Sequence, residues 1–180
     1  MFKPVVAAFV LMVGISLPVS AQSADVDALL ADLADPQTEN WQSVERQIRT
    51  EWSKSGSAAM DLLLQRAEKA IDAEDFDTAL DHLTALTDHA PGFAEGWHAR
   101  ATALFNKNLY GPAMEDLQRA LALNPRHFGA IAGLAVILQQ TGFDNDALTA
   151  WRMLEAIHPH RPELKDAIEA LEKQTGGTAL

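Results

Sequence analysis

Apolar residues recur along this chain at spacings typical of amphipathic helices. Between positions 58 and 161 one apolar pattern returns every 34 residues, and each copy closes with a proline, at Pro91, Pro125 and Pro159. A fixed period of this length indicates paired helices that stack side by side. No run of strand length alternates between apolar and polar residues, so the pattern predicts an all-α solenoid.

The period divides this region into three repeats, over 60–93, 94–127 and 128–161. We predict a pair of helices in each repeat: 58–73 with 76–89, 94–107 with 110–123, and 128–141 with 145–157. Two places in every copy hold alanine, where two helices would approach closely: Ala67, Ala79, Ala101, Ala113, Ala135 and Ala147.

The repeated pattern resembles the tetratricopeptide repeat (TPR) family. That family has a large apolar residue early in the first helix, small residues where the two helices touch, and a proline after the second helix. The second repeat matches best, through Trp97, Ala101, Ala113 and Pro125. The chain departs from the family at the eighth place, where alanine replaces glycine, and at the eleventh, which has no tyrosine. The resemblance implies a helical-hairpin solenoid.

Residues 22–57 lie outside the repeat phase, because Pro36 interrupts what would be a first helix. We predict helices over 24–34 and 39–54. Trp41, Val44, Ile48 and Trp52 form one apolar stripe on the second of them. The expectation is an N-terminal helical hairpin that packs on the first repeat as a cap. Residues 162–180 are predicted to form a C-terminal capping helix, to about position 173, and a tail.

Residues 1–21 have the layout of a cleavable secretory signal peptide. Lys3 precedes an apolar run, Pro18 ends that run, and small residues lead to Ala21. The run is too short for a comfortable membrane span of about 20 residues, although an uncleaved anchor is the alternative. No cysteine is available for a lipoprotein anchor, a disulfide or a thiol nucleophile. We expect a bacterial periplasmic protein with no stable membrane anchor after cleavage.

The chain is acidic, with 14 basic and 25 acidic residues and a formal net charge of −11. Such a balance repels nucleic acid and anionic lipid, and it steers basic partners towards the surface. Solubility of an exported protein is the simpler explanation of the same charge. We therefore expect no nucleic-acid binding and a protein or peptide partner, with a basic partner favoured.

The family resemblance implies that the first helix of each repeat lines a concave groove. The groove would then be acidic at its N-terminal end and lined by small, apolar and amide residues at its C-terminal end. Some family members bind a chaperone carboxylate through lysine, asparagine and arginine, but here Leu64, Glu68, Gly129 and Gly133 occupy the matching places. The candidate partner-binding residues are Asp61, Leu64, Glu68, Asp72, Glu95, His98, Thr102, Phe105, Asn106, Ala132, Val136, Gln139 and Gln140.

Two function classes follow from these patterns. The first is a scaffold that binds a segment of an envelope protein in the groove, with basic ligand residues near Glu68, Asp72 and Glu95. The second is a structural self-assembly module that uses the solenoid ends or the stripe of Trp41 and Trp52. The sequence leaves the partner, the pathway and the oligomeric state open.

No pattern in the chain indicates catalysis. There is no Gly-x-Ser-x-Gly elbow and no glycine-rich phosphate loop before a helix, and the many carboxylates suit solvated helix faces. His127 lies one repeat before His158 and His160, and neighbouring helices pack about 10 Å apart. That separation is too large for these histidines to coordinate one metal ion directly, so we predict no metal site. From the absent motifs, we also predict no enzyme and no cofactor.

Overall fold

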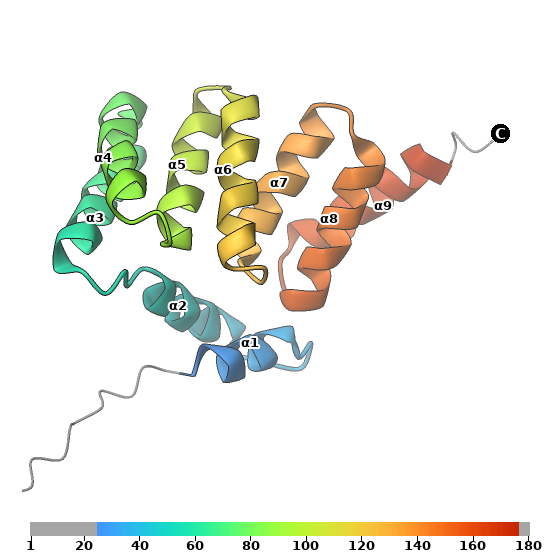
Figure 1. Ribbon diagram of the computed structural model, residues 1–180. Coiled ribbons are helices and arrows are strands. Elements are labelled where there is room, and N and C mark those ends of the chain that lie inside the picture. The colour runs from blue at the N-terminus through green and yellow to red at the C-terminus, as the bar shows by residue number, and fades with distance from the viewer. Residues whose placement is uncertain (1–24, 177–180) are drawn as a thin grey trace, which may run out of the picture.

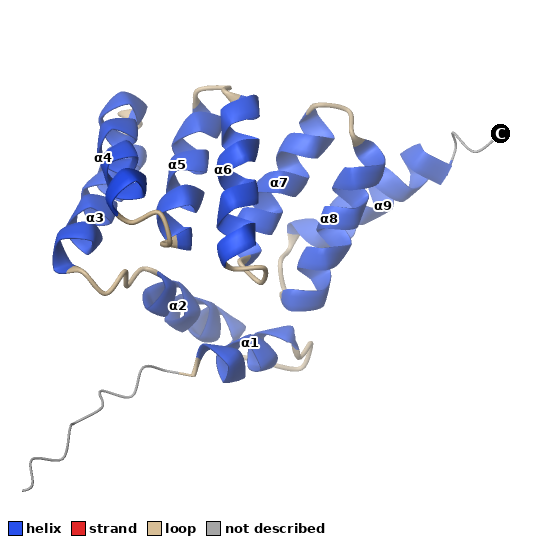
Figure 2. Ribbon diagram, viewed as in Figure 1, coloured by secondary structure: helices blue, strands red, loops and turns tan. Residues whose placement is uncertain are grey.

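The computed structural model describes residues 25–176, which form nine α-helices and no strand (Figures 1 and 2). The predicted signal peptide lies outside the described residues. No helix in the described range is long and apolar enough to cross a membrane. The helices are α1 (Val26–Ala34), α2 (Trp41–Trp52), α3 (Ala58–Asp72), α4 (Phe76–His89), α5 (Ala94–Asn106), α6 (Tyr110–Leu123), α7 (Phe128–Gln140), α8 (Asp144–Ile157) and α9 (Glu163–Gly176).

Helices α3 to α8 form the three predicted pairs, stacked side by side as a solenoid (Figure 1). Each of these six helices begins and ends within one residue of its predicted bounds. The six repeated alanines are at most 1% exposed. Because alanine carries only a methyl group, paired helices approach closely at these places, which confirms the all-α repeat solenoid.

The turn inside each repeat has the same backbone geometry. Glu74, Asn108 and Gly142 occupy equivalent places 34 residues apart, and their φ angles are +57°, +59° and +81°. This left-handed conformation is unfavourable for residues with a Cβ. Among these three turns, the third has glycine and the second has asparagine, which both adopt this conformation readily, so the strain falls on Glu74 of the first.

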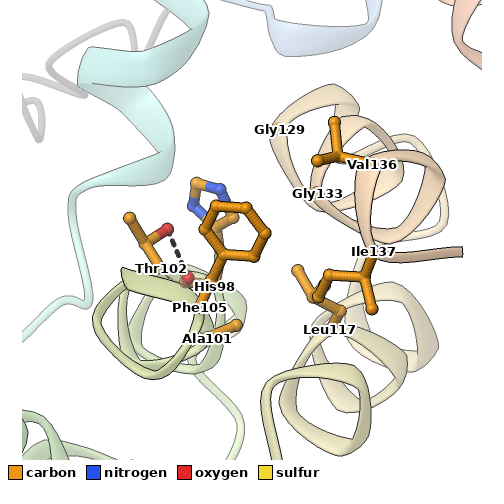
Figure 3. A pocket seen from close by; sticks show the side chains of 9 residues that line it. All are labelled: His98, Ala101, Thr102, Phe105, Leu117, Gly129, Gly133, Val136 and Ile137. Carbon is orange, nitrogen blue, oxygen red and sulfur yellow. Dashed lines mark hydrogen bonds between the residues drawn. The ribbon is translucent and has the colours of Figure 1, made fainter. Parts of the chain in front are cut away.

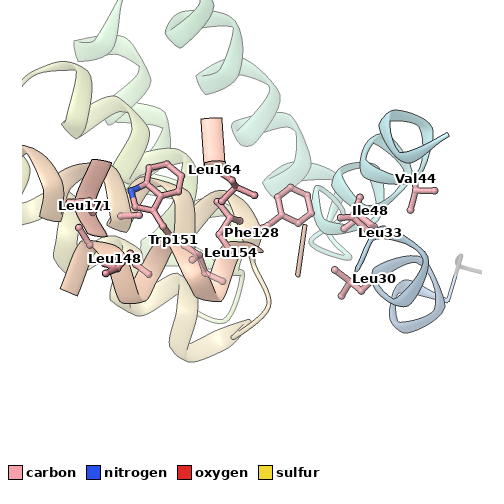
Figure 4. Close-up of a cluster of buried hydrophobic side chains, with 14 residues drawn as sticks. Leu30, Leu33, Val44, Ile48, Phe128, Leu148, Trp151, Leu154, Leu164 and Leu171 are labelled. Carbon is pink, nitrogen blue, oxygen red and sulfur yellow. The ribbon is translucent and has the colours of Figure 1, made fainter. Parts of the chain in front are cut away.

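The N-terminal hairpin does not pack on the first repeat, and that prediction is wrong. Helices α1 and α2 lie along the edge where the repeats are joined, near α7 and α8 (Figure 1). Leu33 and Ile48 are fully buried in one cluster with Phe128 and Leu154 of the third repeat (Figure 4). The apolar stripe of α2 was identified correctly, but a stripe does not specify which surface covers it.

Helix α9 covers the other end of the same cluster. Leu164 and Leu171 are buried against α8, and Ile168 packs beside them (Figure 4). The third repeat is therefore enclosed by α9 at its open end and by the hairpin along its edge. The first repeat has a separate core, centred on Leu64, Leu83 and Leu86.

Candidate functional site

The first helices of the repeats, α3, α5 and α7, contact one another in series and form the inner face of the solenoid. Four predicted groove residues, His98, Thr102, Phe105 and Val136, surround one hollow between α5 and α7 (Figure 3). Its volume is about 140 Å³, and most of its lining is apolar. The remaining lining residues are Ala101, Leu117, Gly129, Gly133 and Ile137.

Two glycines of α7 allow this close arrangement. A Cβ atom on Gly129 would lie 2.9 Å from Nε2 of His98, and one on Gly133 would lie 3.3 Å from Cδ2 of Leu117. The glycines thus make room for the His98 imidazole and the Leu117 side chain at the wall of the hollow. Any larger residue at position 129 would have to displace the ring.

A half-buried carboxylate joins the hollow to the next repeat. Glu95 accepts hydrogen bonds at 2.9 Å from Nδ1 of His98 and at 2.9 Å from Nε2 of His127. Burial alone raises the pKa of Glu95, but the two hydrogen bonds outweigh it and hold the pKa well below its usual range. Glu95 is therefore ionised and can only accept, so both imidazoles donate to it.

The tautomer of His127 follows from the hydrogen bond that its Nδ1 accepts. His127 caps α7, and its Nδ1 accepts a hydrogen bond from the Ala130 amide at 3.1 Å. The proton must then be on Nε2, where it is donated to Glu95. Burial lowers the pKa of His127 despite the hydrogen bond that it donates to Glu95, and the lowered pKa favours this neutral form.

These three residues are also the candidate metal ligands of the described part of the chain. One ligand atom from each of Glu95, His98 and His127 lies within 4.8 Å of the other two. A metal ion at Nε2 of His127 would require the proton on that nitrogen to move to Nδ1. A protonated Nδ1 could no longer accept from the Ala130 amide, so the cap of α7 would be lost. The geometry is therefore that of a hydrogen-bond network. This grouping could not be predicted from the sequence, because His98 and His127 come from different repeats.

Acidic groups line the groove next to this network. Glu68 is exposed, but neighbouring groups partly desolvate it, and this desolvation, and then the negative charges of Glu95 and Asp72, raise its pKa. Among residues 25–176, no lysine or arginine forms an ion pair with Glu68. The N-terminal end of the groove thus carries negative charge that the chain itself does not neutralise.

Two other candidates in the first repeat have structural contacts. The Asp61 carboxylate accepts a hydrogen bond of 2.7 Å from the Ser55 amide, so it holds the linker between α2 and α3. Leu64 is only 2% exposed and belongs to the core of the first repeat. Leu64 clusters there with Leu83 and Leu86 of α4, so most of its side chain is not available to a partner.

The remaining candidates lie on α5 and α7. Asn106 is exposed and donates to the carbonyl of Thr102. Gln139 accepts from the Trp151 indole at 3.2 Å, which ties it to α8. Ala132 is half-buried and Gln140 is exposed.

A second hollow opens between the hairpin and the first repeat. It has a volume of about 470 Å³ and lies between α2 and α3. Thr50, Ser53 and Lys54 line it from the hairpin side, and Asp61 and Glu68 line it from α3. This cleft exists because the hairpin packs on the third repeat. The sequence analysis predicted the hairpin on the first repeat and therefore did not predict the cleft.

The two tryptophans of the hairpin pack against aromatic rings of the second and third repeats. Trp52 stacks on His127 with ring centroids 4.6 Å apart, and it also contacts Phe128. Trp41 stacks on His160 at 5.6 Å and meets the edge of His158. This packing accounts for the stripe that the sequence offered as a self-assembly surface.

The comparisons with known proteins agree with this fold. No family model matches the chain. A TPR repeat-containing protein of Rhizobium etli is 38% identical over 135 residues, which are 75% of this chain and 66% of that protein. The chain thus spans slightly less than two thirds of the relative's length. The chain belongs to the tetratricopeptide repeat family.

Solved structures show the same architecture at low sequence identity. The first TPR domain of Spaghetti (RPAP3), bound to an HSP90 peptide, is 19% identical with a TM-score of 0.63, over 65% of this chain and 93% of that one. The Yersinia enterocolitica secretion chaperone SycD, in complex with a YopD peptide, is 13% identical with a TM-score of 0.62, over 66% and 96%. MamA is 20% identical with a TM-score of 0.62, over 76% and 82%.

Proposed function

We propose that this protein is a periplasmic scaffold that binds a segment of an envelope protein along the face formed by α3, α5 and α7. One observation carries the proposal: an apolar hollow lies beside a group of carboxylates that the chain leaves unneutralised. Solved TPR domains of similar fold bind peptides of HSP90 and YopD, which supports a peptide or protein partner. No catalytic role is proposed.

The charge of the groove selects the kind of partner. Glu68, Asp72 and Glu95 favour a basic ligand segment and oppose an acidic one. The places that would carry a carboxylate-binding lysine, asparagine or arginine hold Leu64, Glu68, Gly129 and Gly133 instead. The ligand is therefore a basic segment, and its terminal carboxylate is not the recognised group.

The proposed location depends on the first 21 residues. Cleavage after Ala21 would place Gln22 at the N-terminus of the mature protein. Intact mass measurement of the protein from a periplasmic extract tests this step. A chain that keeps residues 1–21 and sediments with membranes would contradict it.

A photo-crosslinking residue tests the groove itself. Placed at Thr102, it should capture a defined protein in living cells, and the capture should disappear when Val136→Arg is added. The matched control is the same residue at Gln118, which is exposed on the outer helix α6. Equal capture from positions 102 and 118, or capture from 102 that survives Val136→Arg, would overturn the proposal.

A further inference from the structure

We infer that the ligand is an extended segment with two anchors, one leucine- or phenylalanine-sized side chain in the hollow between α5 and α7 and one lysine or arginine at Glu68. The inference rests on the proposed function and adds the chemistry of the segment. It also makes the N-terminal hairpin one wall of the binding site.

The apolar anchor follows from the hollow between α5 and α7. Its volume is about 140 Å³, and Leu117, Ile137 and Val136 give it apolar walls (Figure 3). A cavity of roughly 150 Å³ with such a lining holds a benzene-sized group. One phenylalanine ring or one leucine side chain therefore matches the space, whereas a tryptophan exceeds it.

The basic anchor follows from Glu68. This side chain is exposed, and the negative charges of Glu95 and Asp72 contribute to its raised pKa. A ligand ammonium or guanidinium would relieve that repulsion. His98 joins the apolar hollow to the neighbouring acidic group, because it lines the hollow and donates to Glu95.

The path of the ligand follows from the second hollow. Glu68 also lines the cleft between α2 and α3, with Thr50 and Ser53 of the hairpin on the opposite side. A chain that passes Glu68 can therefore continue into this cleft. Both hairpin hydroxyls line this cleft and donate to carbonyls of their own helix, so their oxygens can accept hydrogen bonds from the amides of an extended backbone.

The fold also sets the spacing of the two anchors. Adjacent inner helices lie about 8–10 Å apart, so the hollow is roughly 12–15 Å from α3. An extended chain rises about 3.3 Å per residue. The two anchor residues should therefore be roughly three to five positions apart in the ligand.

Selection from a random 12-residue displayed-peptide library on the purified protein tests this footprint. Enriched peptides should carry leucine or phenylalanine three to five positions from lysine or arginine. The same selection on Glu68→Lys should enrich aspartate or glutamate at the basic place. The selected basic peptide should bind Glu68→Lys roughly tenfold more weakly, as expected for a lost charged hydrogen bond. Glu115→Lys on α6 is the charge-matched control and should change its affinity less than about twofold.

The outcomes separate this inference from the proposed function. If Thr102→Arg abolishes peptide binding but Glu68→Lys leaves the charge preference unchanged, the groove binds and the two-anchor footprint is wrong. If enriched peptides bind Thr102→Arg as well as they bind the natural protein, the groove is not the site and both are wrong. Failure to enrich any sequence beyond a parallel selection on Thr102→Arg also contradicts both. Circular dichroism of each variant establishes that its helices are retained.

Discussion

The loop after the first repeat differs from the loops after the second and third in what it offers the N-terminal hairpin. At the place just after the repeat proline, the three loops carry Gly92, Arg126 and His160. A Cβ on Gly92 would have no atom within 4 Å. Arg126 pairs with Asp27 of α1, and Nε2 of His160 lies 2.9 Å from the Asp35 carbonyl oxygen. At this place, the two later loops hold the hairpin by a side chain, and the first loop has no side chain to do so.

The difference shows that repeat phase and side-chain identity have separate effects. The phase places a proline at the end of every repeat, and it builds three similar edges. Phe128, which is fully buried between Trp52 and His158, makes the third repeat the one that the hairpin covers. The uncovered first repeat then forms the cleft between α2 and α3 that we assign to the ligand.

The largest effect that would break this arrangement is expected from Phe128→Ala. Removing a fully buried phenylalanine from a shared core costs about 3–5 kcal/mol in free energy of unfolding. Phe93→Ala, in the first loop, should cost less because Phe93 is only half-buried. Urea unfolding measures both changes. Hydrogen exchange should quicken in α1 and α2 of Phe128→Ala before α3 and α4 are affected, and the opposite order would contradict the assigned docking.

A smaller effect should be seen in how the free energy of unfolding depends on pH, through the buried histidines His158 and His127. His158 is fully buried, and burial lowers its pKa. The Glu45 carboxylate, whose Oε2 lies 3.3 Å from Nε2 of His158, acts in the opposite direction. The positive charges of Arg161 and His160 lower the pKa further. The pKa of His127 is lowered as well. The unfolded chain therefore binds protons more readily, so these groups contribute stability above about pH 6.5 that is lost as the pH falls below it.

The measurement is the free energy of unfolding between pH 7.5 and 5.5. His158→Leu should flatten the decline, because the residue that resists protonation is gone. His89→Leu, an exposed position at the end of α4, is the control and should leave the slope unchanged. Equal slopes for His158→Leu and the natural protein would show that the buried histidine does not respond in this way.

The smallest effect concerns the turns inside the repeats. Glu74 holds a φ of +57°, where glycine fits without strain. Glu74→Gly should therefore stabilise the first repeat by up to about 1 kcal/mol, and Gly142→Ala should destabilise the third by a similar amount. Thermal unfolding of the two variants checks both signs. A loss of stability in Glu74→Gly would mean that the glutamate side chain contributes more than its backbone strain costs.

Most of the fold could be predicted from the sequence, because local spacing determines it. The 34-residue period and the buried alanines located six helices to within one residue. Four groove candidates also meet around one hollow as expected from their repeat positions. Whether these residues bind a partner stays a prediction.

The parts that could not be predicted depend on contacts between distant segments. Nothing local relates Trp52 to His127, or His98 to His127, since their approach depends on how the hairpin and the repeats stack. The place of Leu64 in the repeat predicts a groove position, but its side chain lies in the core of the first repeat. The cleft between α2 and α3 required knowledge of both the hairpin and the first repeat.

The docking of the hairpin on the later loops is tested most directly by cysteine pairs, since the chain has no cysteine of its own. A short bismaleimide should join Asp27→Cys to Arg126→Cys within one chain, as seen by a shift on denaturing gels. The pair Asp27→Cys with Gly92→Cys should remain unjoined under the same conditions. A joined Gly92 pair with an unjoined Arg126 pair would place the hairpin on the first repeat and remove the cleft from the binding site.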